Sequence, residues 1–166
     1  MNDFIYVGID PGLSGGIVAI NDKQEIIYKN IMPVIKGKKT EYNIQKLIEI
    51  LNYSEPSNVC IALEKQHVRP VSGKRACFMT GFGFGMLQAI IEVRGFSYEI
   101  VNPIVWMKDI FKGNDYKDKK ASVQFCQRKW PKEDWKATEK CRVIHKGLTD
   151  AACLALYSWR LNSWTR

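Results

Sequence analysis

The chain has 166 residues, of which 46% are hydrophobic, and its formal net charge is +8. This size predicts a single globular domain over residues 1–166 and excludes two independent domains, because each would be small and no linker-like segment separates them. No apolar run approaches the roughly 18 residues of a membrane span, the five cysteines contain no CxxC pair of the kind that binds zinc, and the basic balance indicates a polyanionic partner such as nucleic acid.

The first part of the chain predicts a three-stranded antiparallel meander. Three short runs rich in β-branched residues are separated by short turns, and the first of them closes at Asp10-Pro11-Gly12. A basic loop is expected over residues 33–39. The expected strands cover residues 4–9, 15–20 and 25–32.

The rest of the chain alternates between helical and strand patterns. The run Asn58–Leu63 is apolar after its first residue and predicts a buried strand parallel to the first. A polar, basic loop is expected over residues 65–77 and another strand over 97–101. The expected helices cover residues 41–53, 78–93, 104–111, 119–128 and 148–161. Together these elements predict an α/β fold whose mixed five-stranded sheet has helices on both faces.

Three acidic residues follow the predicted elements at positions that bring them together. Asp10 closes the first strand and Glu64 closes the central strand, so parallel pairing would place both at one sheet edge. Asp150 is expected in the first turn of the last helix, where it can point off the helix end. Each of the three also has an ordinary interpretation, as a turn residue, a surface group or a partner of the helix dipole.

Carboxylates gathered in one place repel one another unless a cation offsets their charge. Oxygen ligands favour Mg²⁺ or Mn²⁺ over zinc. Such a cluster is typical of two-metal hydrolysis of phosphodiesters, in which the two ions lie roughly 4 Å apart. The acids therefore predict a metal-dependent nuclease with two ions in its site.

Three blocks of sequence resemble the RuvC-like Holliday junction resolvases. They occur in the family's order, over nearly the whole chain, and the segment Phe78–Gln88 (FMTGFGFGMLQ) resembles the phage-type branch of that family. The resemblance implies an RNase H-like fold and a structure-specific endodeoxyribonuclease that nicks four-way junctions symmetrically and leaves 5′-phosphate ends. The matching blocks are Gly8-Ile9-Asp10-Pro11-Gly12, Ala62-Leu63-Glu64 and Thr149-Asp150-Ala151-Ala152.

The resemblance also assigns roles to residues. Asp10, Glu64 and Asp150 match catalytic, metal-binding acids. Lys120 matches a functional basic residue, and Lys108 matches a lysine that contacts DNA. The helix over residues 78–93 matches one that packs against a partner, so a homodimer is expected.

The family usually carries a fourth ligand, Asp or His, three or four residues before the last Asp. Gly147 and Lys146 occupy those positions here. The nearest candidate is His145, which could reach the metal if the chain before the helix loops slightly. Lys146 could instead contact the scissile phosphate, so the fourth ligand stays open among His145, Lys146 and none.

Basic residues surround the expected site and indicate contacts with the phosphate backbone, which carry no sequence information and suit recognition of branch shape. Residues 106–146 alone hold twelve Lys or Arg against six Asp or Glu, which is +6 of the net +8. His67 lies where related resolvases often carry an aromatic side chain that stacks at the junction. The expected DNA-binding residues are Lys65, His67, Arg69, Lys74, Arg75, Lys108, Lys119, Lys120 and Lys146.

Two other functions remain open at this point. One is a different RNase H-like nuclease that cuts RNA–DNA hybrids or branched nucleic acid broadly. The other is a junction-binding protein that has lost cleavage, which the irregular fourth ligand supports. The cysteine usage and the absence of a basic leader at Asn2 and Asp3 predict a cytoplasmic protein, in the host cell if a phage encodes it.

Overall fold

The structure is a computed structural model and describes residues 4–53, 56–68, 71–111 and 115–163. At its centre is a five-stranded sheet of order β3-β2-β1-β6-β7. β1 runs antiparallel to β2, and β2 to β3, whereas β6 runs parallel to both β1 and β7. The predicted mixed sheet is therefore confirmed. Its strands are β1 (Ile5–Asp10), β2 (Gly16–Asn21), β3 (Ile26–Ile31), β6 (Val59–Glu64) and β7 (Ser97–Val101).

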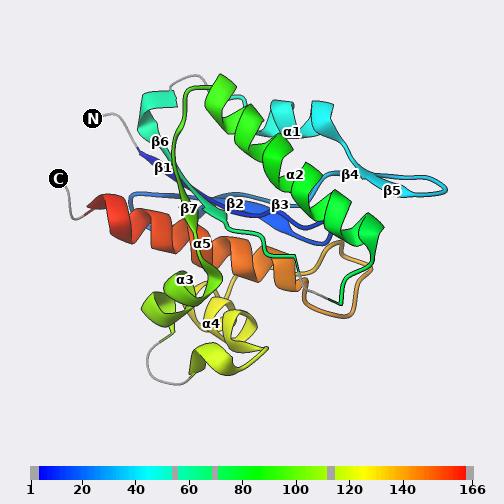
Figure 1. The fold of residues 1–166 in the computed structure, drawn as a ribbon. Helices are drawn as coiled ribbons and strands as arrows, with labels where there is room; N and C mark the ends of the chain where they lie inside the picture. Colours follow the sequence, from blue (N-terminus) through cyan, green and yellow to red (C-terminus); the bar gives the residue numbers. More distant parts are fainter. Residues whose placement is uncertain (1–3, 54–55, 69–70, 112–114, 164–166) are drawn as a thin grey trace.

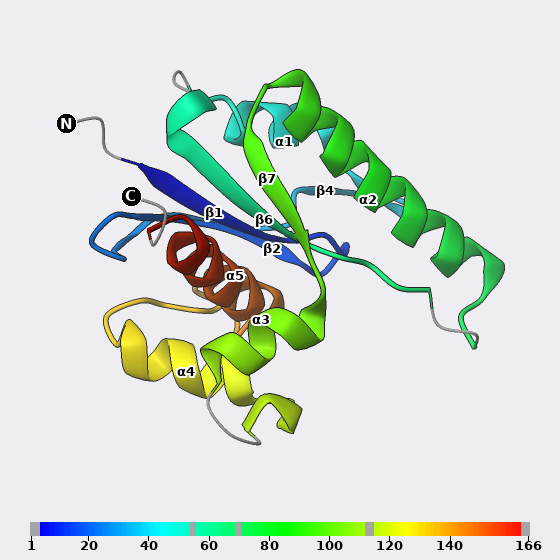
Figure 2. The same ribbon diagram turned by 60° about the vertical axis from the view of Figure 1, so that its left-hand side comes forward.

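Helices cover both faces of the sheet, as predicted. α1 (Ile44–Ile50) and α2 (Lys74–Val93) lie on one face. α5 (Lys146–Ser163) lies across the other, and α3 (Pro103–Ile110) and α4 (Ala121–Lys129) pack outside it (Figures 1 and 2). Two short 3₁₀ helices, η1 (Pro56–Asn58) and η2 (Asp115–Lys117), complete the set.

Each face of the sheet has its own hydrophobic core, because successive side chains of a strand point to opposite faces. On β1, Val7 and Ile9 join the core beneath α1 and α2, whereas Tyr6 joins the core beneath α5. α5 is the best-buried helix, and its residues 151–156 are at most 2% exposed. A helix that lies between a sheet and other helices must be apolar on nearly all sides.

Glycine brings α5 unusually close to the sheet. A Cβ atom placed on Gly8 of β1 would lie 2.0 Å from the carbonyl oxygen of Ala151. Ala151 and Ala152 are themselves small and fully buried. This close approach fixes the start of α5, and with it Asp150, beside the end of β1.

Two predictions in the first half of the chain were wrong. Residues 33–39 are not simply a loop, because β4 (Val34–Lys36) pairs with β5 (Thr40–Tyr42) in a separate hairpin. That pairing takes the residues up to Tyr42 out of the helix predicted over 41–53. α1 begins only after Asn43, whose side chain accepts a hydrogen bond from the Lys46 backbone N–H and so caps the helix.

α2 also differs from its prediction. It begins at Lys74 rather than at 78, so the last part of the predicted 65–77 loop is helical. Its buried residues are Gly83, Leu87 and Ile91. Phe78 and Val93, at the two ends of the helix predicted over 78–93, are 68% and 86% exposed, whereas Met86 and Ile90, which share their face by helical spacing, are partly buried against the core.

The apolar composition of α2 bears on the expectation that no apolar run in the sequence approaches the length of a membrane span. Within the described residues, α2 is long and apolar enough to cross a membrane by length and composition, and 17% of that stretch is buried in the protein. Leu87 and Ile91 nevertheless pack completely against the sheet. A core helix of a folded domain passes the same test, so the composition of α2 is weak support for a membrane span.

Candidate functional site

The carboxyl ends of β1 and β6 lie side by side, as the sequence predicts. Ile9 of β1 is level with Leu63 of β6 in the parallel register, so the next residues are Asp10 and Glu64. Both acids are the last residues of their strands and are half-buried. The sheet therefore places two carboxylates at one edge, each at the end of a buried strand.

Asp10 carries a carboxyl group in an unfavourable environment for a negative charge. Burial, followed by the negative charge of Asp150, raises the pKa of Asp10 to about 7, against a backbone hydrogen bond from Gly12 and the positive charge of Lys146, which lower it. Asp10 is thus more than a turn residue before Pro11. Its pKa is raised by the charge of Asp150, which lies 140 residues later in the sequence.

Glu64 is perturbed in the same way and is held by a specific donor. Burial raises the pKa of Glu64 to about 8, with the charge of Asp10 as the next cause. The indole Nε1–H of Trp106 in α3 donates a hydrogen bond of 2.9 Å to Glu64 Oε2. Trp106 is itself only 2% exposed, so it fixes the orientation of the carboxylate from a rigid position.

Asp150 approaches the same edge from α5 but carries its own counter-charge. Lys146 Nζ lies 3.4 Å from Asp150 Oδ2, one helical turn away. α5 begins at Lys146, not at Leu148, so Asp150 lies in the second turn rather than the predicted first turn. The Lys146 charge also lowers the pKa of both Asp10 and Glu64. The ammonium of Lys146 therefore interacts with all three acids, by an ion pair with Asp150 and by its charge on Asp10 and Glu64.

A cavity of about 290 Å³ opens beside these side chains. Its walls come from the end of β6, from α3, from the segment that leads into α4, and from the start of α5. The lining residues include both acids and cations. Those with charged side chains are Glu64, Asp118, Lys119, Lys146 and Asp150.

The described residues contain no group of three His, Cys, Asp or Glu side chains close enough to bind one metal ion together. Asp10, Glu64 and Asp150 thus share one electrostatic environment without forming a closed ligand cage. The chemistry of the donors still fits a hard divalent cation, because two half-buried carboxylates with raised pKa values lie at one strand edge. Asp10 and Glu64 are the residues that would hold it, with Asp150 beside them.

The structure explains why position 147 carries no ligand. A Cβ atom on Gly147 would lie 2.3 Å from the carbonyl oxygen of Ser14 and 2.7 Å from the backbone of Gly15. Any side chain there would push α5 away from the turn after β1. Glycine at position 147 is therefore a packing requirement of this chain.

His145 precedes α5 and forms a hydrogen bond with the first turn of this helix. Its Nδ1 accepts a hydrogen bond of 3.3 Å from the backbone N–H of Leu148, and the backbone N–H of His145 donates to the carbonyl of Trp135 over 2.8 Å. Burial lowers the pKa of His145. These contacts make it the residue that caps the helix. Its role as a metal ligand stays a prediction that would have to use the other ring nitrogen.

The predicted DNA-binding residues fall into two groups around the site. Lys65, His67, Lys74 and Arg75 are exposed on the side of β6 and α2, and Lys74 and Arg75 belong to the first turn of α2 rather than to a loop. Arg69 lies outside the described residues. All of the described members of this group can reach solvent, as phosphate contacts require.

The second group comes from the basic second half of the chain. Lys119 and Lys146 line the cavity itself. Lys120 instead occupies the N-cap position of α4, where its N–H donates to Asp118, and it is not among the cavity-lining residues. Lys108 of α3 lies over the ring of Tyr116, with Nζ 5.7 Å from the ring centroid. Of the two neighbouring lysines, Lys119 is thus the one beside the acids.

Two residues that support the site carry no recognisable sequence signal. Trp106 is indistinguishable from a core tryptophan until its indole is found on Glu64. Tyr42 donates a hydrogen bond of 2.9 Å to the carbonyl of Pro11, next to Asp10. Its ring leaves no space at Gly83 of α2, where a Cβ would lie 2.2 Å from the hydroxyl oxygen. Only the tertiary structure shows that these residues hold the ends of β1 and β6.

Comparison with known proteins identifies the fold. A scan against models of protein families gave no match, and neither did a search of curated proteins. Among solved structures, "T. thermophilus RuvC in complex with Holliday junction substrate" matches with a TM-score of 0.61 and 13% identity, over 96% of this chain and 97% of that chain. A second, "Thermus thermophilus RuvC structure", matches with a TM-score of 0.59 and 17% identity, over 98% of each chain. The chain thus has the RNase H-like fold seen in RuvC.

Proposed function

We propose that this protein is a Mg²⁺- or Mn²⁺-dependent endonuclease that cuts branched DNA, with the four-way junction as its principal substrate. The observation that carries the proposal is the convergence of Asp10, Glu64 and Asp150 at the carboxyl edge of an RNase H-like sheet. One of the matching RuvC structures is described as a complex with a Holliday junction substrate. The sequence blocks around the three acids support the same substrate.

The acids have distinct positions in this proposal. Asp10 and Glu64 form the half-buried pair that would hold the metal, and Trp106 keeps the Glu64 carboxylate in place through its 2.9 Å hydrogen bond. Asp150 completes the set from α5. When bound, two divalent ions would supply an activated water and stabilise the departing 3′ oxygen of the phosphodiester.

The cations have a different task. Lys119 and Lys146 line the cavity beside the acids, so they would attract and orient the backbone phosphate that enters it. Lys65, His67, Lys74 and Arg75 extend the basic surface on the side of α2, and Lys108 and Lys120 extend it on the other. The result is a phosphate-binding surface on both sides of the carboxylates, which suits recognition of DNA shape rather than of base sequence.

A homodimer would allow two strands of a junction to be cut. The candidate interface is the outward face of α2, which lies on the far side of the sheet from α5 (Figure 1). The rings of Phe78 and Phe82 stack there with centroids 6.2 Å apart and planes 12° from parallel, and the two residues are 68% and 43% exposed. We infer that this apolar stripe packs against the same stripe of a second copy. The same segment resembles the phage-type branch, to which we assign the chain.

The test is cleavage of a synthetic four-way junction in Mg²⁺ and in Mn²⁺, beside a linear duplex and an RNA–DNA hybrid of the same sequence. We expect the junction to be nicked symmetrically, with 5′-phosphate ends, and the duplex to remain largely intact. Equal cutting of the linear duplex would refute junction specificity. Preferred cutting of the hybrid would support the broader nuclease instead.

A second function has one specific observation in its favour. Lys146 pairs with Asp150, and position 147 has no space for a further ligand, so the site could bind junctions without cutting them. In that case the junction would bind tightly and remain intact in either metal. Binding without cutting would favour this second function over the nuclease.

A further inference from the structure

A second basic pocket lies on the far part of α5, away from the carboxylates. It has a volume of about 500 Å³ and is formed by α4, the last turns of α5 and the turn between β2 and β3. This volume falls within the roughly 300 to 1,000 Å³ that is typical of small-ligand sites. Asp150 and Arg160 are ten residues apart on one helix, so the pocket lies about 15 Å along the axis from the acids.

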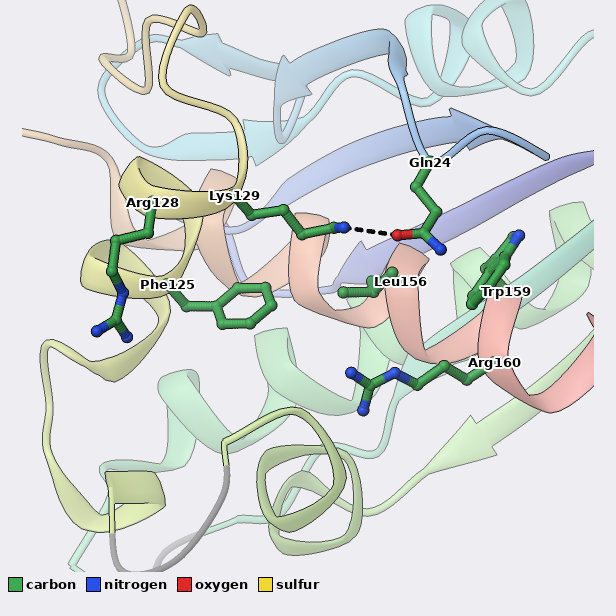
Figure 3. A pocket seen from close by; sticks show the side chains of 7 residues that line it. All are labelled: Gln24, Phe125, Arg128, Lys129, Leu156, Trp159 and Arg160. Atoms are coloured by element: carbon green, nitrogen blue, oxygen red, sulfur yellow. Dashed lines mark hydrogen bonds between the residues drawn. The ribbon is translucent and has the colours of Figure 1, made fainter.

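The pocket is surrounded by cations. Arg128, Lys129 and Arg160 line it, and none of its lining residues is acidic. Figure 3 shows Lys129 and Arg160 reaching toward the same space from opposite sides, one from α4 and the other from α5. Burial and the charge of Arg160 lower the pKa of Lys129. Two like charges that converge in this way favour a bound anion.

Two of these cations are held in place by hydrogen bonds, Lys129 by a neutral side chain and Arg160 by an acidic residue of α3. Lys129 Nζ donates to the side-chain oxygen of Gln24 over 2.5 Å and lies 5.4 Å from the centroid of the Trp130 ring. Arg160 Nη1 donates to Asp109 on α3, at 2.7 Å to the carbonyl and 2.8 Å to the carboxylate. These contacts fix the direction of each side chain. Only Arg160 has its charge offset by an acid among the contacts described.

Aromatic rings form the remaining walls. Phe125 closes one end of the pocket and Trp159 the other, with Leu156 between them on the floor (Figure 3). The indole of Trp159 is fixed because its Nε1–H donates to the carbonyl of Asp22 over 3.1 Å. Both rings are partly exposed. Cations beside accessible aromatic rings are the combination that binds the phosphate and the base of a nucleotide.

The pocket is connected with the carboxylate cavity. A third pocket of about 360 Å³ lies between the two, along α4. It shares Phe125, Arg128 and Arg160 with the cationic pocket, and it shares Phe111, Asp118 and Ala121 with the carboxylate cavity. A single strand held in the cationic pocket could therefore follow the surface of α4 to the acids.

We propose that the pocket formed by Phe125, Arg128, Lys129, Leu156, Trp159 and Arg160 binds one nucleotide unit. Its phosphate lies between Lys129 and Arg160, and its base lies against Trp159. The same chemistry belongs to a nucleotide within a single strand and to a free nucleotide. The proposal does not depend on the cleavage activity, because binding at this pocket requires neither metal nor the three acids.

The first experiment measures binding by the full chain with metal removed by EDTA. The probe is a fluorescein-labelled oligothymidylate of about 15 nucleotides, followed by fluorescence anisotropy, with thymidine 5′-monophosphate, thymidine and a polyglutamate as competitors. We expect the double variant Arg128→Gln/Lys129→Gln to lose about tenfold in affinity for the oligonucleotide. Lys38→Gln/Lys39→Gln removes the same charge from the exposed β4–β5 hairpin, and it is expected to stay within about twofold of the unmodified chain.

The competitors separate the possible ligands. Displacement by the monophosphate but not by thymidine supports a phosphate site, and a measurable monophosphate affinity in the absence of DNA adds free nucleotide as a ligand. Polyglutamate that competes as well as the monophosphate would overturn the proposal, as would equal losses in the two double variants. Circular dichroism of both variants checks that they are folded.

A second measurement locates the bound base without any change to the chain. Oligothymidylate that carries 5-iodouracil is irradiated with the protein, and the cross-linked peptide is found by mass spectrometry. We expect the cross-link on the peptide that contains Trp159 or Phe125. A cross-link confined to other aromatic residues would overturn the assignment, whatever the result of the junction cleavage test.

Discussion

Lys146 Nζ lies 3.4 Å from Asp150 Oδ2 and lowers the pKa of both Asp10 and Glu64. The positive charge of Lys146 therefore acts on the same acids that a divalent ion would need. Lys146 is 61% exposed, so water screens its charge and the ion pair itself is weak. Its main effect is on the potential at the carboxylates.

Lys146→Gln is accordingly expected to tighten the binding of Mn²⁺. Removal of one positive charge a few ångströms from the acids relieves on the order of 1 kcal/mol of repulsion toward a cation in a watery environment, which corresponds to about a fivefold gain in affinity. Isothermal titration with Mn²⁺ at low salt measures it. Lys140→Gln, in an exposed loop, is the control and should leave the affinity unchanged. Weaker Mn²⁺ binding by Lys146→Gln would contradict this account.

Asp10→Asn is expected to abolish cleavage while junction binding is retained. The amide has the shape of the carboxylate but cannot hold a divalent ion in the same way, so the rate should fall at least about 100-fold. Gel-based cleavage and mobility-shift assays on one synthetic junction measure the two properties. Glu139→Gln changes an exposed acid and should cut normally. Substantial cutting by Asp10→Asn would remove Asp10 from the proposed metal site.

Trp106→Phe tests the hydrogen bond to Glu64. Loss of the 2.9 Å contact frees the carboxylate to rotate, so we expect kcat for junction cleavage to fall about tenfold while the apparent affinity for the junction is unchanged. Trp130→Phe is the matched control, because it removes an indole hydrogen bond of 2.8 Å to the carbonyl of Gln24, remote from the acids. Equal losses of kcat in the two variants would indicate a purely structural role.

Gly8→Ala tests the close packing that positions Asp150. The new Cβ would meet the Ala151 carbonyl at 2.0 Å, and α5 would have to move. We expect the free energy of unfolding to fall by about 3 kcal/mol in urea denaturation. Gly81→Ala on α2 has nothing within 4 Å of the added atom, so it should leave stability unchanged or raise it by up to about 1 kcal/mol. Similar effects of the two substitutions would argue against a fixed approach of α5 to β1.

Phe78→Asp tests the proposed dimer. Phe78 is 68% exposed in the single chain, so an introduced charge should not harm the fold of one copy but should disrupt apolar contact between two. Light scattering after gel filtration at micromolar concentration should give a dimer mass for the unmodified chain and a monomer mass for the variant. Val143→Asp, at a residue that is 77% exposed in a different part of the chain, should remain dimeric. A monomeric unmodified chain would refute the interface.

Hydrophobic patterning was sufficient to predict the sheet. The strands that end at Asp10 and Glu64 are short and buried, and each stops at the first charged residue. The local sequence is therefore enough to predict where they end. Parallel pairing of β1 with β6 needs a crossover connection, and the helical pattern before β6 supplies one. Two of the three acids could therefore be assigned to one sheet edge from the sequence.

The errors occurred where long-range contacts outweigh local pattern. Residues 33–39 read as a basic loop, yet Val34–Lys36 pairs with Thr40–Tyr42. The helix predicted over 78–93 begins four residues earlier, at Lys74, and Gly83 of this helix fits closely against Tyr42 of the hairpin. Nothing within either segment records the partner that decides its structure.

The sequence by itself determined the order of the five sheet strands, the surplus of positive charge and the presence of acids at the ends of β1 and β6, because these depend on the local spacing of apolar and charged residues. Only the tertiary structure decided how the acids are arranged. The packing of Gly8 and Gly147 fixes α5 against β1 and the turn after it, excludes a side chain at position 147, and so brings Asp150 of α5 to the edge that carries Asp10. Such contacts join residues more than a hundred positions apart, so they form only when the chain has folded and the core is packed.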